Sequence, residues 1–150
     1  MTWDKNTDSK IEKLHPLVRD DVDSFINLVH EKLEINLRVY EGLRTFEYQD
    51  SLYAKGRTKS GKVVTNAKGG ESYHNYGLAI DVVEIKNGKA IWNNARWVEI
   101  SECAKLLGFE WGGNWTFKDK PHFQKTFGYT IKQLKELHNK KLNSLYVDIG

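Results

Sequence analysis

The chain has 150 residues, of which 39% are hydrophobic and 29% charged, and its formal net charge is +3. This composition is typical of one globular domain and excludes an intrinsically disordered chain. No apolar run approaches the roughly 20 residues of a membrane-spanning helix, so we expect no membrane insertion. The single cysteine, Cys103, excludes an internal disulfide and a multi-cysteine zinc site.

The first half of the chain predicts helices around one strand and one long loop. The expected elements are a short helix after Ser9, an amphipathic helix from Pro16 through Leu33, a strand over 36–42 and a helix from Thr45 through Ala54. Residues 56–71 are polar and rich in glycine and lysine, which indicates a long loop. Long ordered loops are usually functional, so we expect this loop to form a rim or lid.

The second half mixes helix and hairpin patterns. The expected elements are a strand over 78–85, a hairpin strand over 89–92, a helix over 95–107, short strands over 109–111 and 122–124 around a Gly112-Gly113 turn, and a last helix over 130–140. Asn87-Gly88 is a strong signal for the hairpin turn. Because helices and strands do not alternate regularly, the fold class predicted is α+β. No repeat or linker divides residues 1–150, so we expect a single domain.

Two polar clusters carry candidate chemistry. The first, residues 72–81, places His74 at a loop-to-strand junction and Asp81 within the strand that follows. The second joins Asp119 to His122. Two histidines and a carboxylate are a common ligand set for catalytic zinc, and Asp119 is suitably placed to act as a general base.

Taken one at a time, these residues also have a structural interpretation. A single histidine near a strand is usually a hydrogen-bonded structural residue, and we assign that role to His15, His30 and His138. The combined pattern of the two clusters favours a metal site over that interpretation.

The pattern Ser72-x-His74-x-x-Gly77-x-Ala79-x-Asp81, followed by Asp119-x-x-His122, resembles the LAS-type zinc metallopeptidases. This family includes the vancomycin-resistance D,D-peptidases and the L-alanyl-D-glutamate endopeptidases of phage endolysins. The likeness covers roughly residues 14–123 and is strongest to the catalytic domain of Listeria phage endolysins. It extends to residues 42–45, Gln49, 52–58, 64–70 and 111–115.

The resemblance implies a LAS- or hedgehog-like fold, with a small, mostly antiparallel sheet and flanking helices. It implies one zinc ion per chain, bound by His74, Asp81 and His122. It also implies that Asp119 is the general base, where the D,D-dipeptidases carry Glu, and that Arg44 polarises the scissile carbonyl. Ser72 and Gln49 match positions near the substrate.

The activity implied is hydrolysis of the L-alanyl-D-glutamate bond in bacterial peptidoglycan. A D-alanyl-D-alanine carboxypeptidase and a non-catalytic zinc module of the same fold are alternatives, although Asp119 and Arg44 argue against the module. No nucleic-acid motif accompanies the lysines and aromatic residues, so we expect no nucleic-acid partner. Whether Trp111 and Trp115 contact substrate stays open.

The start of the chain, Met1 to Asn6, lacks the apolar core of a Sec signal peptide. We therefore expect a monomer that stays in the cytoplasm until a holin releases it, or that is injected, and that then acts on the cell wall. The sequence does not separate a phage lysin from an injected effector. We expect no separate cell-wall-binding domain within residues 1–150.

Overall fold

An antiparallel sheet organises the structure, a computed structural model that describes residues 1–150. Its strands are β1 (Leu37–Glu41), β2 (Ala79–Lys86), β3 (Lys89–Ile91), β4 (Glu110–Trp111) and β5 (His122–Gln124). They pair in the order β1-β2-β5-β4, and β3 forms a hairpin with β2. This arrangement confirms the α+β class and the small antiparallel sheet.

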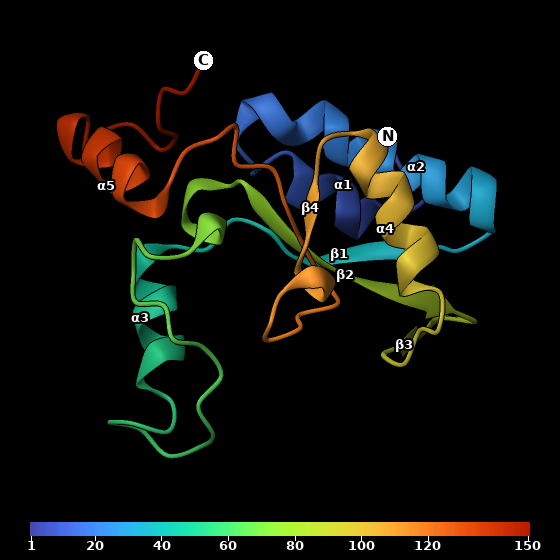
Figure 1. The fold of residues 1–150 in the computed structure, drawn as a ribbon, viewed down its shortest axis with the longest axis horizontal. Coiled ribbons are helices and arrows are strands. Elements are labelled where there is room, and N and C mark those ends of the chain that lie inside the picture. The colour runs from blue at the N-terminus through green and yellow to red at the C-terminus, as the bar shows by residue number, and fades with distance from the viewer.

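Three helices lie together on one side of this sheet (Figure 1): α1 (Lys5–Ile11), α2 (Arg19–Leu33) and α4 (Trp97–Leu106). The core between them and the sheet centres on Phe25, whose ring lies 5.0 Å from the ring of Phe123. Side chains alternate along a strand. Since Ile80, Val82 and Phe123 face this core, the neighbouring Asp81 and His122 point to the opposite, open face.

Two further helices, α3 (Phe46–Ala54) and α5 (Ile131–Lys140), lie away from this helical layer (Figure 1). The side chains of Thr45 and Thr130 cap their first turns, as the sequence predicts. Short 3₁₀-helical turns occur at Pro16–Val18, Tyr73–Tyr76 and Gly112–Asn114. No helix has the length and apolar character that crossing a membrane requires.

The first helix differs from its prediction. It begins at Lys5 rather than after Ser9, and Leu14 lies beyond its end. Asp4 determines this start, because its carboxylate accepts a hydrogen bond from the backbone N–H of Thr7. The same carboxylate receives two hydrogen bonds from Arg38 of β1, at 2.8 and 3.0 Å. A contact between distant segments therefore supports the cap.

The loop over residues 56–71 is fastened to α3 rather than free. Gln49 donates to the carbonyl oxygen of Ala67 at 2.9 Å, and Asp50 accepts from the backbone N–H of Gly69 at 2.7 Å. The predicted hairpin turn at Asn87 and Gly88 is also present, with φ values of 54° and 75°. Positive φ at both positions is the reason that Asn-Gly suits this turn.

Candidate active site

Sheet pairing and one turn bring three predicted ligands together on the open face. Asp81 of β2 lies directly across from His122 of β5, and their Oδ1 and Nδ1 atoms are 3.3 Å apart. His74 comes from the turn before β2, and its Nε2 lies 3.2 Å from Oδ2 of Asp81. One ligand atom from each residue falls within 4.8 Å of the others, and all three residues are buried. The group can hold a metal ion.

Local structure explains the spacing of the histidine motif. The hydroxyl of Ser72 accepts from the backbone N–H of His74 and so caps the turn Tyr73–Tyr76. Gly77 ends the turn at φ 70°, and a Cβ there would lie 2.5 Å from the backbone nitrogen of His15. Glycine is therefore required where the chain turns from His74 into β2.

Hydrogen bonds fix the tautomers of both histidines. Nδ1 of His74 lies 2.8 Å from the carbonyl oxygen of Gly42, so it must carry the proton and leave a lone pair on Nε2. Nε2 of His122 lies 2.8 Å from Oε1 of Gln124, whose amide nitrogen donates to Glu110. Nδ1 of His122 is therefore left with a lone pair.

Both lone pairs point at the Asp81 carboxylate. Nε2 of His74 is buried and has no hydrogen-bond partner. Two nitrogen lone pairs that face a carboxylate are repelled by its negative charge unless a cation or a proton lies between them. The donor set of two imidazoles and one carboxylate therefore fits a divalent metal ion, and zinc in particular.

The close packing of these ionisable groups shifts their pKa values. Burial works to raise the pKa of Asp81, but His122 and His74 outweigh burial when they carry a proton on the nitrogen that faces the carboxylate, and they hold the pKa well below its usual range. Burial works to lower the pKa of His122, and its contact with Asp81 raises the pKa overall. Burial first, and then the negative charge of Asp81, raise the pKa of Asp119.

Asp119 lies at the rim of the site. Its Oδ2 is 3.9 Å from Nδ1 of His122, and half of its side chain is exposed. Its backbone is fixed, because its N–H donates to Gly112 and its carbonyl oxygen accepts from His122. The carboxylate is thus placed next to the predicted ligands but open to solvent and substrate.

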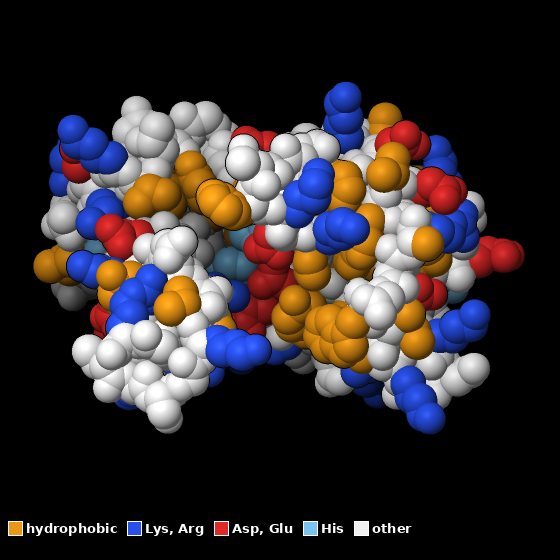
Figure 2. Space-filling view, turned by 60° about the horizontal axis from the view of Figure 1, so that its bottom comes forward, with side chains coloured by type: hydrophobic (Ala, Val, Ile, Leu, Met, Phe, Trp, Pro, Cys, Tyr) orange, Lys and Arg blue, Asp and Glu red, His pale blue; other side chains and the backbone are white.

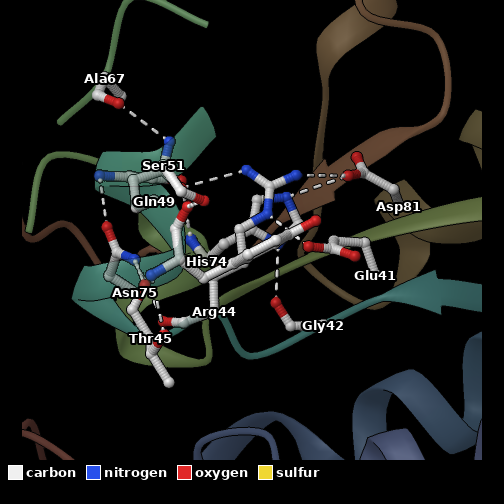
Figure 3. Close-up of polar contacts among 12 residues, drawn as sticks. Glu41, Gly42, Arg44, Thr45, Gln49, Ser51, Ala67, His74, Asn75 and Asp81 are labelled. Carbon is white, nitrogen blue, oxygen red and sulfur yellow. Dashed lines mark hydrogen bonds and ion pairs between the residues drawn. The ribbon is translucent and has the colours of Figure 1, made fainter. Parts of the chain in front are cut away.

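Arg44 points its guanidinium into the same site (Figure 3). Its Nε donates to Glu41 at 2.7 Å, one Nη to Gln49 at 3.2 Å and the other to Asp81 at 3.4 Å. The two acidic partners and the amide fix a planar cation beside the histidines. The structure therefore brings Arg44 and Asp119 to the predicted ligands.

The two residues predicted near the substrate occupy supporting positions. Gln49 is fully buried, and its amide joins Arg44 to the loop carbonyl of Ala67 (Figure 3). Ser72 is partly exposed, and its hydroxyl caps the turn that carries His74. Both hold catalytic candidates in place, and direct contact of either one with substrate stays a prediction.

Figure 2 shows that the open face is hollowed at its centre, where acidic and histidine side chains gather. Trp115 covers one flank of the site, with its ring 5.0 Å from the ring of His122. The indole N–H of Trp111 donates to the carbonyl oxygen of Lys120 at 2.7 Å, which ties β4 to the following loop. Trp111 therefore has a structural role, and Trp115 has an exposed edge beside a predicted ligand.

Three functional residues escape the sequence analysis: Glu41, Glu110 and Gln124. Gln124 could have been found, because it lies two residues after His122 and so shares its face of β5. Glu41 lies opposite Asp81 only because β1 changes register between Val39 and Glu41. Nothing local in the sequence marks that irregularity.

Of the other three histidines, His15 and His30 are hydrogen-bonded, as predicted. Nε2 of His15 lies 2.7 Å from the carbonyl oxygen of Val147, and Nδ1 of His30 lies 2.6 Å from Oδ1 of Asn36. His138 packs its ring against Phe46, with 4.6 Å between centroids.

The arrangement of these residues suits a metallopeptidase, and comparison with known proteins shows that class. The model of peptidase family M15, described as D-alanyl-D-alanine carboxypeptidase, matches residues 65–125. Together with the relatives given next, this match shows that the chain belongs to the M15 peptidase family.

The relatives are named for one activity within this family. The chain is 48% identical over 122 residues to the peptidoglycan L-alanyl-D-glutamate endopeptidase CwlK of Bacillus subtilis, covering 74% of this chain and 72% of CwlK. It is 35% identical over 94 residues to an L-alanyl-D-glutamate peptidase of Listeria phage A118, covering 60% of this chain and 30% of the phage protein. These matches confirm the family resemblance.

A solved structure supports the same assignment. The crystal structure of the L-Ala D-Glu endopeptidase ChiX of Serratia marcescens matches with a TM-score of 0.62 and 27% identity. The match covers 85% of this chain and 91% of that one. It confirms the fold that the resemblance implies.

Proposed function

We propose that this peptidase is a zinc-dependent endopeptidase that hydrolyses the L-alanyl-D-glutamate bond of peptidoglycan stem peptides. The observation that carries the proposal is the convergence of His74, Asp81 and His122 beside Arg44 and Asp119. The relatives support the choice of bond, since CwlK, the phage peptidase and ChiX are all named for it.

His74, Asp81 and His122 would hold one zinc ion per chain. Bound zinc supplies a Lewis acid that polarises the scissile carbonyl and lowers the pKa of water to about 7. The chain prepares for the ion by fixing each imidazole through its outer nitrogen, to Gly42 and to Gln124. Such outer contacts orient metal ligands and set their tautomers.

Asp119 acts as the general base. Its half-exposed carboxylate accepts a proton from the attacking water and later delivers it to the leaving amine. Burial and the charge of Asp81 raise the pKa of Asp119, which strengthens it as a base.

Arg44 stabilises the oxyanion that develops on the scissile carbonyl. Because Glu41 and Gln49 fix the guanidinium before substrate binds, little reorganisation is needed as the negative charge forms. Gln49 and Ser72 support Arg44 and His74 respectively. The lysines of the loop over 56–71 favour an acidic stem peptide on that side.

Bacterial peptidoglycan is accordingly the proposed partner. A monomeric state and the absence of a nucleic-acid partner stay predictions.

Mass spectrometry of purified peptidoglycan digested with the protein tests the proposal. We expect new L-alanine carboxyl ends and new D-glutamate amines, with loss of whole stem peptides. Release of free D-alanine from pentapeptide stems, with the L-alanyl-D-glutamate bond intact, would identify a D-alanyl-D-alanine carboxypeptidase instead. Zinc binding without hydrolysis of either bond would identify a non-catalytic zinc module.

A further inference from the structure

A groove of about 530 Å³ runs along the outer edge of the sheet, next to the site. It lies between the exposed side of α4 and the chain from Phe109 to Trp115. Its lining includes Val98, Glu102, Phe109, Trp111, Asn114 and Trp115. We call it the edge groove. The mechanism proposed above uses none of these six residues.

The edge groove shares one wall residue with the proposed active site. The indole of Trp115 lines the groove and also packs against His122, with 5.0 Å between ring centroids. Trp115 keeps 37% of its surface exposed. One residue therefore belongs to the groove wall and to the flank of the metal site.

The aromatic surface of the groove is held in one position. Trp111 is anchored by its hydrogen bond to Lys120, and Gly113 crosses the face of the Trp111 indole. A Cβ at Gly113 would lie 2.2 Å from that ring. The chain can follow this path only with glycine, which places Asn114 and Trp115 beside Trp111.

This arrangement suits a sugar ring. Aromatic faces can cover the apolar C–H face of a pyranose, while Asn114 and Glu102 offer a donor and acceptors to hydroxyl and acetamido groups. Glu102 and Glu110 are countered in the lining only by Lys105, so the groove does not favour an anionic peptide. The acidic stem peptide is instead expected at the lysine-rich loop over 56–71.

The substrate proposed above requires a sugar close to the reacting bond. In peptidoglycan, L-alanine is joined through a lactyl group to N-acetylmuramic acid. The sugar thus begins within about two residue lengths, roughly 7 Å, of the scissile carbonyl. Trp115 lies within that reach of His122. Resting on the proposed function, we propose that the edge groove is a glycan subsite that binds the N-acetylated sugar carrying the stem peptide.

The test compares two substrates that share the scissile bond. One is a disaccharide-tetrapeptide, and the other is the same tetrapeptide with an acetylated N-terminus and no sugar. The wild-type protein should cut the sugar-linked substrate with a kcat/KM at least about tenfold higher, the scale of one favourable ring contact. Trp115→Ala and Asn114→Ala should bring this ratio towards one.

Phe117→Ala is the matched control, because Phe117 belongs to the same loop, is 90% exposed and does not line the groove. It should keep the wild-type ratio. Asn114→Ala guards against indirect effects on the metal site, since it leaves the ring of Trp115 against His122. Its rate on the sugar-free peptide should therefore match wild type.

A binding experiment gives a second readout. Titration with N-acetylmuramyl-L-alanine should shift the indole N–H resonances of Trp111 and Trp115 and leave those of Trp3 and Trp92 in place. Equal kcat/KM for the two substrates, with the L-alanyl-D-glutamate bond cut in both, would overturn the subsite and leave the proposed function standing. Failure to cut that bond in either substrate would overturn the proposed function itself.

Discussion

Replacing Asp119 with asparagine isolates the proton-transfer role of this residue. The amide is close to the carboxylate in shape but cannot accept a proton from the attacking water. A general base contributes about 10²- to 10⁴-fold to rate, which corresponds to roughly 2.7–5.5 kcal/mol of activation free energy. We therefore expect Asp119→Asn to lower kcat by at least about 100-fold.

The structure predicts that this loss leaves folding and zinc content unchanged. The Asp119 side chain is half exposed and is 3.9 Å from His122, while its backbone makes the hydrogen bonds to Gly112 and His122. A substitution at such a position typically changes the free energy of unfolding by no more than about 0.5 kcal/mol. Asp148→Asn is the control, since that carboxylate is 82% exposed and has no part in the proposed mechanism.

The assay measures the release of D-glutamate amines from purified peptidoglycan, with zinc content and thermal unfolding recorded for each variant. A general base must be deprotonated, so wild-type kcat should fall as the pH drops through the pKa of Asp119. Burial and Asp81 raise that pKa in the metal-free site, whereas the charge of bound zinc would lower it. With zinc in excess, the variant should lack this limb. A variant that keeps more than about a tenth of the wild-type rate, a difference of only about 1.4 kcal/mol, would refute the assignment.

Three further sets of variants test the rest of the site and its support. Alanine at any one of the three proposed ligands, His74, Asp81 and His122, should abolish stoichiometric zinc binding in metal analysis. Full zinc content in all three variants would reject the site. Gln124→Ala should weaken zinc binding about 10- to 100-fold in a chelator competition, because it removes the hydrogen bond that orients the imidazole of His122. Unchanged zinc affinity would show that this hydrogen bond is dispensable. Asp4→Ala should lower the free energy of unfolding by about 2–4 kcal/mol in urea, since it removes a helix cap and a charged hydrogen-bond pair with Arg38. Burial raises the pKa of Asp4, but its hydrogen bonds with Arg38 and Thr7 lower the pKa overall. This stabilisation should therefore be present above the unfolded-state pKa and be lost as the pH falls through the folded-state pKa. A difference in stability between Asp4→Ala and wild type that does not change with pH would contradict this prediction.

Local signals in the sequence were sufficient for most of the secondary structure. Apolar spacing predicted α2, Thr45 and Thr130 marked two helix starts, and Asn87-Gly88 marked the hairpin. Each of these signals acts over a few residues, so no knowledge of the rest of the chain is needed. The first helix was misplaced because its cap, Asp4, is held by Arg38 from a strand 34 residues away.

The sequence by itself also indicated the chemistry of the site, since the two motifs supply two imidazoles and two carboxylates and the family resemblance adds Arg44. Only the tertiary structure decided how they meet. The register of β2 with β5 places Asp81 across from His122, and the irregularity in β1 places Glu41 where it can hold Arg44. Burial places Gln49 where it supports Arg44, and it places Gln124 behind His122. Register and burial depend on packing between distant segments, and for that reason no local pattern could have predicted them.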